Sequence, residues 1–260
     1  MRLSVGGIET FVATGGCAFD PALPTVVFLH GAGLDHSVWA LLARAFAHRG
    51  LGVLAPDLPG HGRSAGAALT SIAAMAEWTA ALLGTAGARQ ARLVGHSMGS
   101  LAALETAARY PDRVVALALI ATAAPMRVSE ELLTAARDND HAAIDMIALW
   151  GNGYRASLGG SLMPGVWMLG GAERLLEKAA PGVLFADLSA CNTYRDGLAA
   201  AAKIIVPTIV ILGGRDLMTP ATSGRTLAAA IPAAQVTVLE GAGHMLMSER
   251  PEQVLAALRM

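Results

Sequence analysis

The chain has 260 residues, 54% of them hydrophobic, and a formal net charge of −1 at pH 7. This length fits one α/β domain with an insertion, and a charge near zero without a basic cluster argues against a nucleic-acid partner. The longest apolar stretches, near residues 114–124 and 204–212, are too short for the roughly 20-residue helix that spans a bilayer. We therefore expect a globular protein without a membrane span.

Cysteine usage and the start of the chain bear on the compartment. The first residues, MRLSVGGI, lack the apolar run of a secretory signal, and Cys17 and Cys191 lack the spacing of a zinc or redox motif. We expect both thiols to be reduced, no metal or cofactor to be bound, and the location to be cytoplasmic. The pattern does not decide between a monomer and a homodimer.

The first predicted elements are a short hairpin at residues 3–13 and a buried strand at residues 26–29. The strand opens into a glycine-rich turn, His-Gly-Ala-Gly, at residues 30–33. A turn of this kind can serve as a plain connection, but beside a catalytic serine it can direct a backbone N–H at a developing oxyanion. We expect Ala32 to supply that N–H.

Residues 95–99, Gly-His-Ser-Met-Gly, follow a strand predicted at 91–94 and lead into a helix predicted at 98–109. The two glycines permit a sharp turn that exposes the hydroxyl of Ser97 at the edge of a sheet. This Gly-x-Ser-x-Gly pattern is common by chance, but the strand before it and the helix after it favour a nucleophile. The backbone N–H of Met98 would be the second oxyanion donor, while His96 would have a structural role beneath the turn.

Residues 125–203, which we call the cap segment, interrupt the alternation of strands and helices. The segment contains helix-like stretches near 130–137, 141–149 and 172–178 and no obvious buried strand. We expect a helical lid over the site, inserted into a core of residues 1–124 and 204–260. Trp150, Trp167 and Met126 are candidates for lining its pocket, although large apolar residues at helical spacing also pack internally.

The general base and its orienting acid are expected near the C-terminus. A strand at 209–212 is followed by Asp216, and a strand at 236–239 is followed by a glycine-containing loop that carries His244. A serine hydroxyl requires such a base, held in one orientation by a third group. Along the chain the three residues occur in the order Ser97, Asp216, His244. This is one of the chain orders in which catalytic triads occur on unrelated folds.

Other side chains could compete for these roles. Asp187 and Asp196 are rival acids, but neither directly follows a clear buried strand, and the strand-like run at 118–123 offers no carboxylate. His36 and His48 flank a likely helix, and His141 lies in a polar, helix-like stretch. Histidines in such places are usually solvated or structural.

With these motifs the chain resembles the α/β-hydrolase superfamily over essentially its whole length. The matching features are Trp39 after the His-Gly turn, the loop Asp-Leu-Pro-Gly-His-Gly-Arg-Ser at 57–64, the serine turn at 95–99, the run Gly-Gly-Arg-Asp at 213–216, and Gly-His at 243–244. The resemblance implies an α/β-hydrolase fold: a mostly parallel central sheet flanked by helices, with a helical cap inserted between two strands. It also implies a Ser-His-Asp triad, whereas relatives that act on haloalkanes or epoxides carry aspartate in place of Ser97.

The expected function is that of a serine hydrolase cleaving a small or medium carboxylic ester, lactone or thioester through an acyl-enzyme. Two alternatives remain open at this stage. Carbon–carbon bond hydrolases and lyases use the same triad for proton transfer, and some members of the superfamily are receptors that bind a ligand without turnover.

Overall fold

The computed structural model describes residues 1–160 and 165–258 of the chain. Within them, eight strands form one sheet in the order β1-β2-β4-β3-β5-β6-β7-β8. The hairpin predicted at residues 3–13 is present, and it pairs antiparallel with β4, whereas β3 to β8 run parallel. The strands are β1 (Arg2–Val5), β2 (Ile8–Ala13), β3 (Thr25–Leu29), β4 (Gly52–Pro56), β5 (Ala91–His96), β6 (Val114–Ile120), β7 (Thr208–Gly213) and β8 (Gln235–Leu239).

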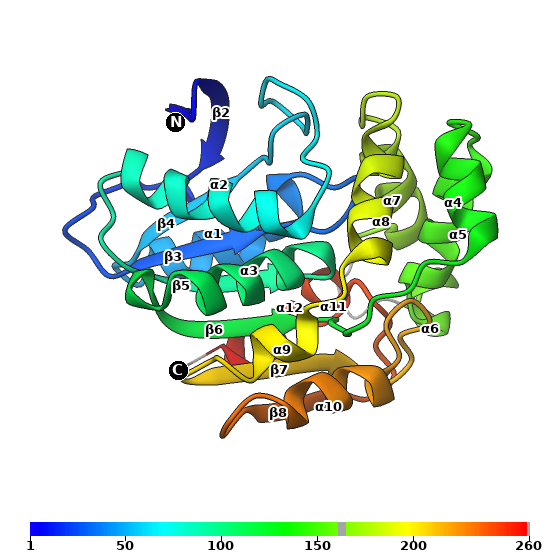
Figure 1. Ribbon diagram of the computed structural model, residues 1–260. Coiled ribbons are helices and arrows are strands. Elements are labelled where there is room, and N and C mark those ends of the chain that lie inside the picture. The colour runs from blue at the N-terminus through cyan, green and yellow to red at the C-terminus, as the bar shows by residue number, and fades with distance from the viewer. Residues whose placement is uncertain (161–164, 259–260) are drawn as a thin grey trace.

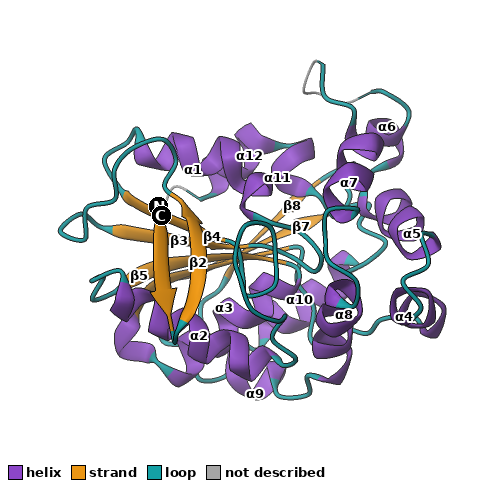
Figure 2. Ribbon diagram, turned by 90° about the horizontal axis from the view of Figure 1, so that it is seen from above, coloured by secondary structure: helices purple, strands orange, loops and turns teal. Residues whose placement is uncertain are grey.

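Two layers of helices cover the sheet, as the view along it in Figure 2 shows. One face carries α1 (Ala40–Ala47), α11 (Leu246–Glu249) and α12 (Pro251–Ala257); the other carries α2 (Ile72–Thr85), α3 (Met98–Arg109), α9 (Gly197–Ala201) and α10 (Ala221–Ala229). Short 3₁₀ turns, η1 (His36–Trp39) and η2 (Pro111–Arg113), precede α1 and β6.

The central strands are buried on both faces, which explains why they read as continuous apolar runs. Along β3, Val26 and Phe28 pack with Trp39 on the α1 side, while Val27 and Leu29 belong to the cluster on the α2 and α3 side. Alternate residues of a strand point to opposite faces, so a single strand supplies both halves of the core. The α/β-hydrolase fold expected from the sequence is confirmed.

The helices between β6 and β7 lie beyond the carboxyl ends of the parallel strands, on the right in Figure 1. They are α4 (Glu130–Arg137), α5 (Ala142–Gly151), α6 (Tyr154–Ser157), α7 (Met168–Leu176) and α8 (Val183–Thr193), after which α9 returns to the sheet. Ser129 caps the first of them, because its side chain accepts a hydrogen bond from the N–H of Leu132. Ligands of open α/β sheets bind at this end of the strands.

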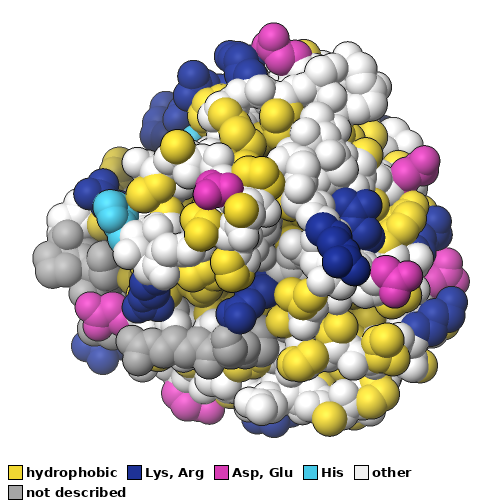
Figure 3. Space-filling model, turned by 90° about the vertical axis from the view of Figure 1, so that its left-hand side faces the viewer, with side chains coloured by type: hydrophobic (Ala, Val, Ile, Leu, Met, Phe, Trp, Pro, Cys, Tyr) yellow, Lys and Arg dark blue, Asp and Glu magenta, His cyan; other side chains and the backbone are white. Residues whose placement is uncertain are grey.

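The surface away from these helices carries mixed charge. In Figure 3, which shows the left-hand side of Figure 1, Lys and Arg side chains are interspersed with Asp and Glu. This mixture agrees with the formal net charge of −1. Within the described residues, every helix is too short or too polar to cross a bilayer.

Candidate active site

Ser97 occupies a strained turn between β5 and α3. Its backbone has φ 53° and ψ −120°, a left-handed φ that is uncommon for residues other than glycine. Strain of this kind persists only where the surroundings impose it, and it is the geometry of a nucleophile elbow. Only 9% of Ser97 is exposed, and the residue lines a cavity.

The two glycines of the motif are required by close packing of backbones. A Cβ atom at Gly95 would collide with the backbone of Gly99 and Ser100, and one at Gly99 would collide with the carbonyl groups of Leu29 and His30. The start of α3 can therefore approach β3 and β5 only with glycine at both positions.

The structure brings together the predicted base and acid. Asp216 lies in the loop that follows β7, and His244 lies in the loop that follows β8. Their side chains are joined by a hydrogen bond of 2.8 Å between Nδ1 of His244 and Oδ2 of Asp216. Both residues are buried, and His244 lines the same cavity as Ser97.

Hydrogen bonds fix the carboxylate of Asp216. The backbone N–H groups of Met218 and Thr219 donate to Oδ1 at 2.9 and 2.8 Å, and the hydroxyl of Thr219 donates to Oδ2 at 2.7 Å. Burial raises the pKa of Asp216, but the charge interaction with His244 and these hydrogen bonds outweigh burial, so the net pKa lies below its ordinary value. Asp216 is therefore ionised at neutral pH, and its carboxylate can accept a hydrogen bond from a protonated Nδ1 of His244.

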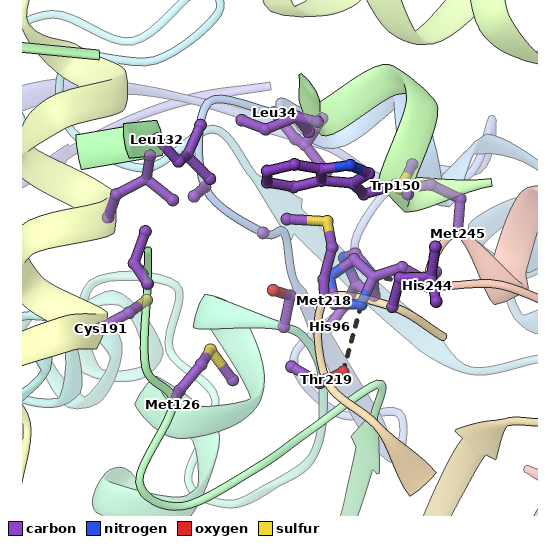
Figure 4. A pocket seen from close by; sticks show the side chains of 18 of the residues that line it. Leu34, His96, Met126, Leu132, Trp150, Cys191, Met218, Thr219, His244 and Met245 are labelled. Atoms are coloured by element: carbon purple, nitrogen blue, oxygen red, sulfur yellow. Dashed lines mark hydrogen bonds between the residues drawn. The ribbon is translucent and has the colours of Figure 1, made fainter. Parts of the chain in front are cut away.

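Thr219 was not predicted from the sequence. Its hydroxyl also lies 3.2 Å from Nδ1 of His244, the contact drawn as a dashed line in Figure 4. The sequence signal for such a residue is weak, because a threonine three positions after an aspartate is common in turns.

His96 supports the His244 loop from below. Nε2 of His96 lies 3.0 Å from the carbonyl oxygen of His244, and the two rings are 4.8 Å apart between centroids. Complete burial, with a contribution from His244, lowers the pKa of His96 to about 3. His96 is therefore neutral, and Nε2 carries the proton that it donates to this carbonyl.

The backbone around His244 is also tied to the cap segment. The N–H groups of His244 and Met245 donate to the carbonyl of Gly151 at 3.0 and 2.9 Å. The buried carboxylate of Glu249 accepts from the N–H of Gly243 at 3.0 Å and from that of Gly153 at 3.2 Å. Gly151, at the end of α5, and Gly153, just after it, thus hold the loop that carries His244, and no local sequence pattern predicts this connection.

The two backbone N–H groups predicted as oxyanion donors, those of Ala32 and Met98, have no acceptor within the described residues. Met98 is the first residue of α3, where backbone N–H groups lack an intrahelical partner, and Ala32 lines the cavity beside Ser97. Two unpaired donors at a helix N-terminus and an adjoining turn can bind a negatively charged oxygen.

The cavity has a volume of about 230 Å³ and is lined by residues of both the core and the cap segment. Figure 4 shows His244, Thr219 and His96 on one side, with Trp150, Leu132 and Cys191 around the remainder. Most of its wall is apolar. The larger apolar side chains in its lining are Leu34, Met126, Val128, Leu132, Ile147, Trp150, Leu176, Leu188, Cys191, Leu217, Met218 and Met245.

Of the three predicted pocket residues, Trp150 and Met126 line this cavity. The prediction for Trp167 is wrong. Trp167 precedes α7, rests against Gly170, lies outside the cavity lining and is 72% exposed. Helical spacing could not reveal this, because Trp167 lies before the first turn of its helix and not on its inner face.

The rival acids lie elsewhere. Asp187, on α8, is fully buried and bonds to His61 and to the N–H of Gly33. Asp196 is exposed at the start of α9, and the exposed His141 pairs with Asp145 and Glu177.

One group of residues has the composition of a metal site. Ligand atoms of Asp35, His36 and Asp57 lie within 4.8 Å of one another. Their hydrogen bonds already explain the arrangement: Oδ1 of Asp57 accepts from the N–H and from Nδ1 of His36, both at 2.7 Å, and Asp35 caps η1 through the N–H of Ser37. The group joins the segment that follows β3 to the loop that follows β4.

Comparison with known proteins agrees with this geometry. The model of the alpha/beta hydrolase family matches residues 26–258. A pimeloyl-[acyl-carrier protein] methyl ester esterase from Chromobacterium violaceum is 34% identical over 245 residues, covering 90% of this chain and 92% of that protein. An esterase of the same name from Neisseria meningitidis serogroup C is 30% identical, covering 92% and 93%.

A similar solved structure is the enol-lactonase from Burkholderia xenovorans LB400. It superposes with a TM-score of 0.84 at 26% identity and covers 98% of this chain and 97% of that chain.

Proposed function

Because the chain belongs to the alpha/beta hydrolase family and is a hydrolase, we propose that it cleaves small or medium carboxylic esters through Ser97, His244 and Asp216. The observation that carries this proposal is the 2.8 Å bond between His244 and Asp216 at the wall of the cavity that Ser97 also lines. Lactones and thioesters undergo the same acyl transfer and belong to the same substrate class.

In the proposed mechanism, Nε2 of His244 takes the proton of the Ser97 hydroxyl as its oxygen attacks the ester carbonyl. The carbonyl oxygen becomes an oxyanion, which the N–H groups of Ala32 and Met98 stabilise. The tetrahedral intermediate then collapses, and the alcohol leaves with the proton that His244 held. Water, deprotonated by His244, attacks the acyl-enzyme and releases the carboxylic acid and the free serine.

The cavity supports a limit on the size of the acyl group. Its volume of about 230 Å³ is below the roughly 300–1,000 Å³ of pockets that enclose drug-sized ligands. Its apolar wall favours an alkyl chain over a polar acyl group. The relatives named methyl ester esterases support a small alcohol as leaving group. We also propose that residues 125–203 act as the cap domain that selects the substrate, on a core of residues 1–124 and 204–260.

Partitioning between water and methanol tests the acyl-enzyme. Butyrate esters with three different leaving groups are hydrolysed in the presence of added methanol, and the ratio of methyl butyrate to butyric acid is measured. A common acyl-enzyme predicts one ratio for all three esters. A ratio that changes with the leaving group, or no turnover of any ester, would overturn the proposal and favour proton-transfer chemistry or ligand binding without turnover.

A further inference from the structure

The turn formed by residues 31–34, which we call the oxyanion loop, is held by a side chain from the cap segment. Oδ2 of Asp187, on α8, accepts a hydrogen bond from the backbone N–H of Gly33 at 2.8 Å. Asp187 is fully buried, and it is separated from Gly33 by 154 positions in the sequence. A buried carboxylate is costly unless it is paired, so this contact is a specific one.

The same oxygen of Asp187 pairs with His61. Nε2 of His61 lies 2.7 Å from Oδ2 of Asp187, and Nδ1 lies 3.0 Å from the carbonyl oxygen of Pro59. Both ring nitrogens face acceptors, so both donate only when the imidazole is a cation. Burial lowers the pKa of His61, but the charge and hydrogen bond of Asp187 outweigh it and raise the net pKa.

The oxyanion loop needs such a restraint because of Gly33. This residue has φ +66°, a conformation that glycine enters and leaves at little steric cost. The peptide group that joins Ala32 to Gly33 carries the N–H that Asp187 holds, so the contact fixes the backbone of Ala32 on its C-terminal side. The N–H of Ala32 is one peptide away and has no acceptor within the described residues.

We propose that Asp187 is a positioning residue that holds the oxyanion loop so that the N–H of Ala32 faces the reacting carbonyl. This inference rests on the proposed function, since it assigns Ala32 to the oxyanion. It also gives α8 a part in catalysis: the cap segment shapes the oxyanion hole as well as covering the cavity. Asp187 touches no reacting atom and acts through the loop.

The predicted signature is a loss of transition-state stabilisation without loss of substrate binding. Asp187→Ala should lower kcat by up to roughly 10²-fold and leave KM nearly unchanged. This loss of kcat should not exceed the loss caused by removing an oxyanion donor outright. Asp187→Asn should lose less, because its amide oxygen can still accept the N–H of Gly33. Asn192→Ala is the matched control: Asn192 also lies on α8, and its side-chain oxygen accepts the N–H of Val128 at 3.1 Å, away from the oxyanion loop.

The experiment measures kcat and KM for p-nitrophenyl butyrate per active site, with active sites counted by a fluorophosphonate. It also measures the inhibition constant of an alkyl trifluoromethyl ketone, which forms a tetrahedral adduct with a serine, and the melting temperature of each variant. The proposal predicts that the inhibition constant rises in Asp187→Ala by the same factor as kcat falls. In Asn192→Ala, the melting temperature should fall while both kinetic quantities stay within about threefold.

Two results would overturn the proposal: Asp187→Ala with kcat per titrated site within threefold of the parent, or a rise in KM alone. A lower melting temperature with unchanged kcat would show that Asp187 only fastens the cap segment. Failure of the proposed function is a separate outcome, because the parent protein itself would then neither bind the fluorophosphonate at Ser97 nor hydrolyse the ester.

Discussion

Oδ2 of Asp216 accepts a hydrogen bond from Nδ1 of His244 at 2.8 Å, and this one contact fixes which nitrogen of the imidazole is free to act as a base. An ionised carboxylate can only accept, so the proton of the neutral ring lies on Nδ1. In the proposed mechanism, the lone pair of Nε2 is the one that accepts the proton of the Ser97 hydroxyl.

Asp216→Asn should reverse this assignment. The N–H groups of Met218 and Thr219 donate to Oδ1, so the amide oxygen of asparagine takes that side and its NH₂ faces His244. Nδ1 must then accept, and Nε2 carries the proton. We expect kcat to fall by roughly three to four orders of magnitude, the scale of the same change in serine proteases. The measurement is the rate of ester hydrolysis by a variant whose melting temperature is unchanged. Near-parental activity would show that Asp216 has no part in the mechanism.

Thr219→Val should have a smaller effect on the same carboxylate. The substitution removes the 2.7 Å hydrogen bond to Oδ2 but keeps the backbone donor to Oδ1. A hydrogen bond to a charged group, such as the ionised carboxylate of Asp216, contributes about 1.5–3 kcal/mol, so kcat should fall by roughly 10- to 100-fold. Thr219→Ser retains the hydroxyl and serves as the control. If the serine variant lost as much activity as the valine variant, the methyl group and not the hydroxyl would be responsible.

Stability should fall on acidification because of two buried histidines whose pKa values are lowered, His96 and His30, of which His30 can be tested by substitution. Nδ1 of His30 lies 2.9 Å from the carbonyl of Gly31, and Nε2 accepts the N–H of Leu58 at 3.1 Å, an arrangement that fits only the neutral ring. Burial, together with His61, lowers the pKa of His30 to about 4 from 6.5. Between these values the unfolded chain binds the proton and the folded chain does not, so the free energy of unfolding decreases as pH falls from 6.5 to 4.

The loss from His30 should be on the order of a few kcal/mol over this interval. His61 does not offset this loss. Its pKa is raised in the folded protein, so the stability that it contributes is already fully present below pH 6.5 and does not increase on further acidification. Urea unfolding at pH 7.5, 6.5, 5.5 and 4.5 checks the prediction. In His30→Leu the decrease between pH 6.5 and 4.5 should be smaller than in the parent, and an equally steep decrease would assign it to other groups.

Trp150→Ala and Trp167→Ala form a matched pair for the cavity. Trp150 lines it, whereas Trp167 is largely exposed. In the parent, kcat/KM should rise along an acyl series by up to about 0.8 kcal/mol per buried methylene and then fall once the cavity is full. Trp150→Ala should move the optimum to longer chains, and Trp167→Ala should leave it in place. A monotonic rise in the parent, or the same optimum in both variants, would contradict a closed acyl pocket.

The sequence predicts the features that depend on local patterns. The apolar runs of β3, β5, β6 and β7 follow from burial on both faces of a parallel sheet, and the glycine spacing around Ser97 follows from a tight strand-to-helix turn.

Features that join distant segments could not be predicted in this way. The contact of Asp187 with Gly33 and that of Glu249 with Gly153 cross from the cap segment to the core, and no local pattern records either pairing. From the sequence, Asp187 is only a rival acid for the triad. The prediction for Trp167 fails for a related reason, because apolar character does not show on which side of a chain a residue will lie.

The most direct test of the account is the site at which the protein reacts with a fluorophosphonate. The parent protein is incubated with the reagent, digested, and mapped by tandem mass spectrometry, with Ser97→Ala treated in parallel and both assayed for ester hydrolysis. The account predicts one adduct, on Ser97, together with loss of activity in proportion to labelling, and neither labelling nor hydrolysis in Ser97→Ala. Labelling of another serine, or hydrolysis by Ser97→Ala within a few-fold of the parent, would contradict it.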